Sequence, residues 1–137
     1  MKLLFLNRMK TRKIGIGAEG IQHKYFANTI RQYEVYKKLN CLFWTYSASG
    51  EYRKLTTGAL LKAKGLKTGF PDYHFIYRVD GIDHNIFLEF KAGKNKQSQS
   101  QIDFQNLYKD SKNSFYYVVY FVEEAINILI KHNVITD

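Results

Sequence analysis

The hydrophobic pattern changes its period along the chain, and each change predicts a new secondary-structure element. Between positions 19 and 40, apolar residues recur at three- and four-residue steps, which is typical of an amphipathic helix. The apolar stripe is expected to follow Ile21, Tyr25, Asn28, Gln32, Val35 and Leu39, broadened by Phe26, Ile30, Tyr33 and Tyr36. A short aromatic run at 42–46 then predicts a strand.

The middle of the chain predicts a short helix followed by a hairpin. Thr57 is expected to cap a helix that reaches Lys64 and ends at Gly65. Two β-rich runs at 72–78 and 85–91 flank Asp80-Gly81, which is a strong signal for a tight turn. A hairpin sets the start of its first strand beside the end of its second. The residues near 72 and near 90 should therefore meet at one end of a sheet.

The last third of the chain predicts a helix, a strand and a final helix. Ser98 is expected to cap a helix that runs to about Lys109. The dense apolar run at 115–121 predicts a strand buried on both faces, and 122–133 predicts the closing helix. The resulting order, α-β-(α)-β-β-α-β-α, predicts an α/β fold in which helices flank a mixed central sheet.

The charge of the chain narrows the class of partner. Lys and Arg number 21 against 12 Asp and Glu, giving a formal charge of +9 and a pI near 9.6. A basic domain with interleaved Tyr and Phe is typical of proteins that bind nucleic acid, with a solvated basic surface as the alternative. We expect a basic N-terminal arm at 1–18 and a single domain at 19–137.

Two further features bear on location. No apolar run is long enough to cross a bilayer, and the single cysteine, Cys41, rules out an internal disulfide. Together they favour a reducing cytoplasm and no membrane partner. Met9 is an alternative start of the chain.

Asp72 and Glu89 stand at the two strand ends that the hairpin should bring together. Carboxylates so placed can hold Mg²⁺ or Mn²⁺, which prefer oxygen ligands, with the backbone carbonyl of Phe90 as a further ligand. Lys91 follows Glu89 by two positions, so strand alternation puts both side chains on one face. There an ammonium can orient an attacking water or neutralise phosphate charge. The alternative is that all three are ordinary surface charges.

The context of this pair is similar to a known family. Residues 58–72, GALLKAKGLKTGFPD, resemble the segment leading into the catalytic Asp of VRR-Nuc domains, which belong to the PD-(D/E)xK nuclease superfamily. Glu89-Phe90-Lys91 matches the E-x-K element of that family, and 98–101 resembles its S-x-x-Q. Residues 49–53 loosely match its N-G-G-x-R loop. The resemblance, to stand-alone phage-type members, covers roughly 25–130 and is strongest at 58–72.

This resemblance implies a restriction-endonuclease-like fold and a metal-dependent DNA endonuclease. The implied catalytic residues are Asp72, Glu89, Lys91 and Gln101, with Mg²⁺ or Mn²⁺ as the cofactor and no small-molecule cofactor. It also implies a homodimer, a phage or bacterial intracellular location, and branched or four-way-junction DNA as the substrate.

One part of the family pattern is not matched by a clear residue here. The family often carries a Glu in the helix before the first strand, which helps to bind the metal. Glu19, Glu34 and Asn28 are the candidates in this chain, with Asn28 nearest the expected position.

Basic residues flank the carboxylates in the sequence and are expected to follow the DNA backbone without reading bases. They are Arg53, Lys62, Lys64, Lys67, Lys94 and Lys96. Two other classes of function stay open beside the nuclease. One is an accessory protein of the same fold that binds nucleic acid without cleaving it, and the other is a protein-interaction subunit whose basic surface is incidental.

Overall fold

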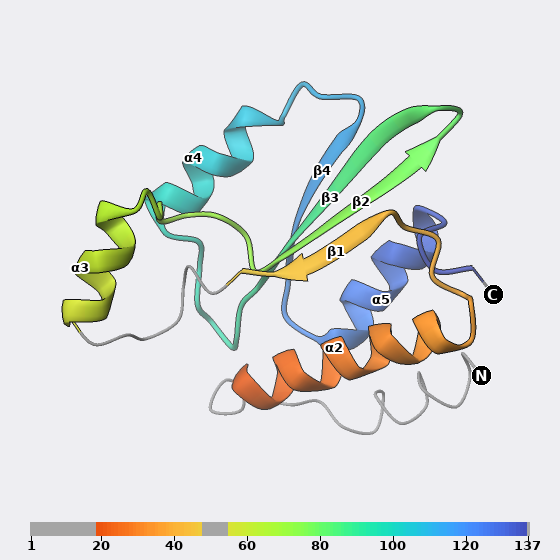
Figure 1. Ribbon diagram of the computed structural model, residues 1–137, viewed down its shortest axis with the longest axis horizontal. Coiled ribbons are helices and arrows are strands. Elements are labelled where there is room, and N and C mark those ends of the chain that lie inside the picture. Colours follow the sequence, from red (N-terminus) through yellow and green to blue (C-terminus); the bar gives the residue numbers. More distant parts are fainter. Residues whose placement is uncertain (1–18, 48–54, 137) are drawn as a thin grey trace. The chain divides into compact units, whose positions relative to one another are not determined.

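The computed structural model describes residues 19–47 and 55–136, so the predicted arm at 1–18 lies outside the described residues. The described chain is mixed α/β, which confirms the predicted class (Figure 1). Its elements, in chain order, are α2 (Glu19–Val35), β1 (Phe43–Tyr46), α3 (Leu55–Ala63), β2 (Tyr73–Val79), β3 (Ile82–Phe90), α4 (Gln99–Leu107), β4 (Ser114–Val119) and α5 (Val122–Lys131).

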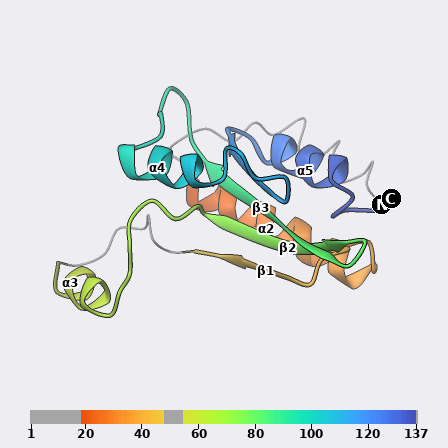
Figure 2. The ribbon, with the colours of Figure 1, turned by 90° about the horizontal axis from the view of Figure 1, so that it is seen from above.

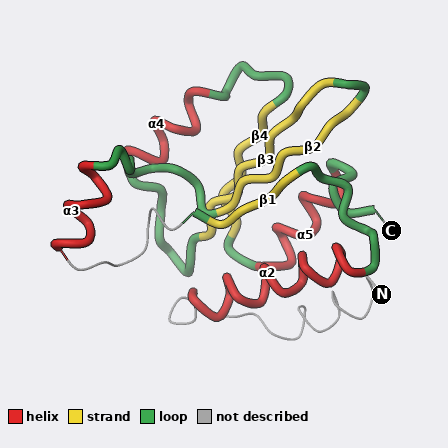
Figure 3. The backbone as a smooth tube through the Cα atoms, viewed as in Figure 1, coloured by secondary structure: helices red, strands yellow, loops and turns green. Residues whose placement is uncertain are grey.

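The strands form a mixed sheet in the order β1-β2-β3-β4, coloured yellow in Figure 3. β1 pairs with β2, and β2 with β3, in antiparallel register. Two amides connect the β3 and β4 segments: Asn85 donates to the Asn113 carbonyl and Lys91 to the Val119 carbonyl, each at 2.8 Å. Because both partners advance by six residues between the two bonds, β4 runs parallel to β3.

The predicted hairpin turn is confirmed. The β2–β3 ladder closes at the pair Val79 and Ile82, leaving Asp80 and Gly81 as a two-residue loop. Both loop residues have positive φ, 51° and 78°, as a type I′ turn requires. Only glycine adopts this conformation freely, and Asp tolerates it, so the Asp-Gly pair fixes both the turn and the strand register.

The chain divides into two compact units. The first comprises Met1–Leu42, Phe90–Asn95 and Val118–Asp137, and the second Phe43–Glu89 and Lys96–Tyr117.

In the first unit, α2 and α5 contact each other. The buried face of α2 is made of Gln22, Phe26, Thr29, Ile30 and Tyr33, and the Phe26 ring lies 5.2 Å from that of Phe90.

The predicted main stripe of α2 was wrong. Ile21 is 60% exposed and Val35 72% exposed, whereas Gln22 is only 1% exposed. Gln22 and Thr29 can be buried because their side chains donate hydrogen bonds to the carbonyls of Tyr120 and Tyr25. The residues expected only to broaden the stripe, Phe26, Ile30 and Tyr33, are its centre.

In the second unit, α4 lies over one face of the sheet (Figure 2), and an aromatic cluster connects the two. The ring of Phe104 on α4 lies 5.1 Å from Phe87 on β3 and 5.3 Å from Phe70. Phe87 also stacks on His74 of β2 at 4.5 Å and touches Tyr108 at 5.0 Å. This cluster covers the sheet face that carries the odd-numbered side chains of β3.

Three predicted boundaries or environments need correction. Thr57 lies inside α3, which begins at Leu55, while Gly65 follows the helix end with φ of 102° as expected. β4 ends at Val119 rather than Phe121, because Phe121 adopts the extended cap position of α5. β4 is also an edge strand of the sheet, so its middle residues are half-exposed instead of buried on both faces.

Candidate functional site

The strand register places Asp72 opposite Glu89. The β2–β3 ladder ends here at the pair Tyr73 and Leu88, and one further step in the same register sets Asp72 opposite Glu89. On the other side of Asp72, the Ser47 amide donates to the Asp72 carbonyl at 2.7 Å, which continues the β1–β2 ladder. Asp72 is therefore held by a main-chain bond from the β1 side, just before β2 begins.

The two acidic residues are buried and in contact. Asp72 is 8% exposed and Glu89 is 4% exposed. The main-chain amide of Asp72 donates to Oε2 of Glu89 at 3.2 Å. Like charges that face each other across two strands repel, and burial strengthens the repulsion. An oxygen-rich, negatively charged pair of this kind suits a hard divalent cation, whose charge would remove the penalty.

Gln101 connects α4 to this pair, and the two ends of its carboxamide have different partners. Its Oε1 accepts from the Ser98 main-chain amide at 2.8 Å, and the main-chain amide of Gln101 donates to the Ser98 Oγ, which completes a capping box at the start of α4. Its Nε2 donates to Oε1 of Glu89. Because the oxygen is used by the cap, the nitrogen must face Glu89, so the cap also orients the contact with the carboxylate.

Gly69 allows the loop before Asp72 to approach α4 closely. It has φ of 91°, and a Cβ at this position would lie 2.5 Å from the carbonyl oxygen of Ser100. Ser100 directly precedes Gln101 in the first turn of α4. The missing side chain thus sets how near the loop that carries Asp72 can come to the helix that carries Gln101.

Gly69→Ala is expected to destabilise the protein more than Gly65→Ala. Both replacements place a Cβ at positive φ, which costs about 1–2 kcal/mol, but only position 69 adds a clash with backbone atoms. Position 65 has φ of 102° and nothing within 4 Å, so it is a matched control. Urea unfolding measures both losses, and equal losses would contradict the close approach.

Tyr116 reports the negative charge of the pair. The pKa of its phenol is raised to about 12, mainly by burial; a hydrogen bond from Gln97 Nε2 to the phenol oxygen opposes the rise, and the carboxylates of Glu89 and Asp72 add to it. The phenol therefore stays protonated at neutral pH and is available as a hydrogen-bond donor.

The other predicted site residues are distributed as follows. Lys91 comes directly after β3, and Phe90 is the last residue of that strand. Arg53 lies outside the described residues. The remaining predicted DNA-contacting residues are all exposed: they are Lys62, Lys64, Lys67, Lys94 and Lys96. Lys62 lies in the last turn of α3.

The candidates for an acid on the first helix are Glu19, Glu34 and Asn28. Glu19 begins α2, Glu34 is exposed near its end, and exposed Asn28 accepts a hydrogen bond from Arg31 at 3.1 Å. The buried polar residues of this helix are Gln22 and Thr29, and the hydrophobic pattern missed both. Gln22 Nε2 donates to the Tyr120 carbonyl at 3.0 Å, while Gln22 Oε1 has no partner among the described residues.

His74 has a structural role in the sheet. Its Nε2 lies 2.8 Å from Oδ1 of Asn85, and Asn85 donates to Ser114 at 3.1 Å, which connects β2, β3 and β4. The ring is also stacked on Phe87. Both interactions hold the histidine in the sheet.

Among residues 19–47 and 55–136, no three His, Cys, Asp or Glu residues gather as a potential set of metal ligands. No helix there is long and apolar enough to span a membrane. The chain matches no model of a known family, no curated protein and no solved structure.

Proposed function

We propose that this protein is a metal-dependent DNA endonuclease with a restriction-endonuclease-like fold of the PD-(D/E)xK type. The observation that carries the proposal is the arrangement around Glu89. Its two carboxylate oxygens accept from the Asp72 amide and from Gln101 Nε2, in a buried position opposite Asp72. This buried, oxygen-rich arrangement supports the proposal, because hard divalent cations prefer carboxylate oxygens as ligands.

Each residue has a distinct role in this proposal. Asp72 and Glu89 hold Mg²⁺ or Mn²⁺, with the Phe90 carbonyl as a further ligand. The bound cation supplies Lewis-acid stabilisation of phosphate charge and lowers the pKa of water. Lys91 orients the water that attacks phosphorus and balances the charge that develops on the phosphate. Gln101 is a positioning residue, because it contacts Glu89 and not the reacting atoms.

The partner in this proposal is DNA, held by the exposed lysines at 62, 64, 67, 94 and 96 together with Arg53. The formal charge of +9 supports a polyanionic substrate. Cutting both strands of a symmetric substrate needs two active sites, so the proposal includes a homodimer and favours branched DNA such as a four-way junction.

The test is a cleavage assay on labelled linear, flap, bubble and four-way-junction DNA with Mg²⁺ or Mn²⁺. The proposal predicts cutting of at least one substrate that stops when EDTA is added. Absence of cutting on every substrate with either cation, by a folded protein, would overturn the nuclease proposal.

Gln101→Glu is expected to separate the two roles of Gln101. Glutamate at this position still accepts from the Ser98 amide, so the capping box and the melting temperature should be retained. It cannot donate to Glu89 and adds a like charge beside it, so cleavage should fall at least about tenfold. Gln101→Ala loses both roles and serves as the comparison. Cleavage by Gln101→Glu at the wild-type rate would contradict the positioning role given to Gln101.

The second candidate is a nucleic-acid-binding accessory protein of the same fold that does not cleave. One observation favours it: only two carboxylates meet at the candidate site among the described residues, and the buried polar residues of α2, Gln22 and Thr29, carry no charge. Tight DNA binding without any cation-dependent cutting would select this candidate.

A further inference from the structure

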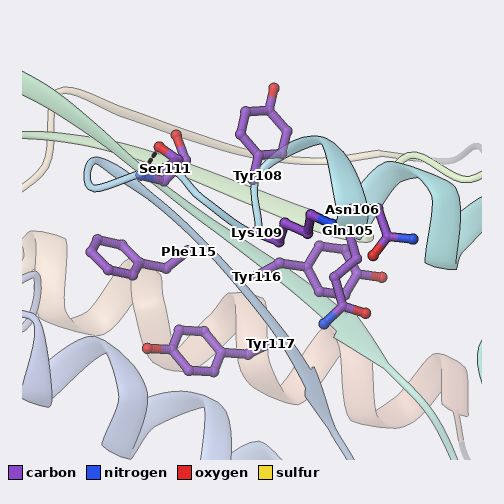
Figure 4. Close-up of a pocket in the computed structure, with 9 residues that line it drawn as sticks. Gln105, Asn106, Tyr108, Lys109, Ser111, Phe115, Tyr116 and Tyr117 are labelled. Atoms are coloured by element: carbon purple, nitrogen blue, oxygen red, sulfur yellow. Dashed lines mark hydrogen bonds between the residues drawn. The ribbon is translucent and has the colours of Figure 1, made fainter.

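A second recess lies in the same unit as the acidic pair, between the end of α4 and β4. It has a volume of about 390 Å³ and is lined by Gln105, Asn106, Tyr108, Lys109 and the aromatic residues 115–117 of β4, with serines at its rim (Figure 4). Ligand sites in proteins commonly measure 300–1,000 Å³. The recess is thus large enough for a small planar group with part of its attached chain.

The chemistry of the lining favours a nucleobase joined to phosphate. The side chains of Tyr108 and Tyr116, a lysine and two carboxamides contribute to it, and no carboxylate does. Phe115 and Tyr117 lie on the other side of β4 from Tyr116 (Figure 4). Aromatic rings offer a stacking surface to any base, carboxamides can pair with base edges, and an ammonium attracts phosphate.

Three polar side chains of the recess keep hydrogen-bonding capacity that no bond within the described residues uses. The Asn106 side chain is exposed and makes no hydrogen bond to a described residue. Gln105 uses its Oε1 to accept from Gln97 at 2.9 Å, which leaves its Nε2 to donate. The half-exposed Tyr116 phenol accepts from the same Gln97, and its raised pKa keeps its proton. These groups are held in place but keep hydrogen-bonding capacity for a ligand.

The recess follows the candidate site along one helix. Gln105 and Asn106 come four and five positions after Gln101, which is about 6–8 Å along the axis of α4. Successive stacked nucleotides are separated by about 3.4 Å. A strand whose phosphate lies at Glu89 would therefore bring a base two or three nucleotides away to the recess.

We propose that this recess binds an unpaired nucleobase of the DNA strand, two to three nucleotides from the phosphate that is cut. The proposal rests on the proposed function, since it takes the ligand to be DNA. A base inside a duplex is stacked and cannot enter the recess, so the site selects DNA with a single-stranded or splayed segment beside the cut. It gives a physical basis for preferring flaps and branches over continuous duplex.

The test uses a single-stranded DNA decamer with 2-aminopurine near its centre, in EDTA, so that binding is measured without cleavage. Stacking on tyrosine is expected to give saturable quenching of the fluorescent base. A decamer with an abasic site at that position should bind about 5- to 150-fold more weakly, the range expected when one stacked base is lost.

Matched variants locate the binding. Lys109→Ala should weaken binding at least about threefold and lower the salt dependence, whereas Lys112→Ala removes the same charge from an exposed residue outside the recess and should have less effect. Asn106→Ala should weaken binding of the intact decamer but not of the abasic one. Asn127→Ala, at an exposed position of α5, is its control. Both recess residues are exposed, so these variants are expected to fold.

The outcomes separate this inference from the proposed function. Equal binding of the intact and abasic decamers, together with Glu89-dependent cleavage, would show that the recess does not bind a base, while the proposed nuclease function would still hold. Saturable quenching without cleavage of any substrate would support base binding by the recess and would contradict the proposed nuclease function. If Asn106→Ala changes the oligomeric state and leaves DNA binding unaltered, the recess is a protein contact at the edge of β4, and the inference is overturned.

Discussion

Glu89→Gln is expected to lower the rate of DNA cleavage by about a hundredfold to a thousandfold or more, the range seen when a single preorganised electrostatic group is removed from an active site. Glutamine has almost the same shape and can still accept from the Asp72 amide, so the local fold should be retained. It lacks the negative charge that a hard cation requires. DNA affinity measured in EDTA should change little, because the proposed function assigns that affinity to the exposed lysines.

The matched control for this prediction is Glu123→Gln. Glu123 lies in the first turn of α5. Its replacement by Gln is the same chemical change at a position with no role in the proposed site. It should cleave at the wild-type rate. Undiminished cutting by Glu89→Gln, or equal losses in the two variants, would contradict the role given to Glu89.

Phe87→Ala is expected to have the largest effect on stability, about 3–5 kcal/mol of unfolding free energy. Phe87 is 3% exposed, and its ring touches rings on β2, α4 and the segment after α4. Loss of the Phe87 ring leaves a cavity beneath α4, so the position of the Gln101 side chain should also be less well defined. Phe43→Ala, at a residue 59% exposed in β1, is the control and should stay within about 0.5 kcal/mol of wild type.

Urea unfolding followed by circular dichroism measures both variants. Similar losses for Phe87→Ala and Phe43→Ala would show that the aromatic cluster does not hold α4 to the sheet.

The hairpin and the helix cap could be predicted from sequence because short-range chemistry determines them. Asp80-Gly81 allows positive φ at both turn positions, which fixes the register that sets Asp72 opposite Glu89. Ser98 followed three residues later by Gln101 is the pattern of a capping box, and the cap forms. The contact of Gln101 with Glu89 depends on both, so the site follows from two local signals.

The buried face of α2 could not be predicted in the same way. Aromatic and apolar residues surround much of that helix, so the spacing allows several stripes. The choice is made by tertiary contacts: Gln22 is buried because it reaches the Tyr120 carbonyl, 98 residues away in the chain. Ile21, at the next position, is left exposed.

The partial exposure of β4 could not be predicted from the sequence either. A continuous apolar run indicates a strand but not its place in the sheet. β4 lies at the edge, where Phe115, Tyr116 and Tyr117 keep partial exposure and line the recess beside α4. The residues of β4 that line the recess became candidates for a ligand site only once the strand order was known.

Titration of Mn²⁺ into the protein by isothermal calorimetry tests the central claim most directly, because the claim is that Asp72 and Glu89 form a metal centre. We expect saturable binding by the wild type and by Asp83→Asn, whose exposed carboxylate pairs with Arg78 at 2.8 Å on the same hairpin. We expect that binding to be lost in Asp72→Asn. Equal binding by Asp72→Asn, or no binding by the wild type, would contradict the account.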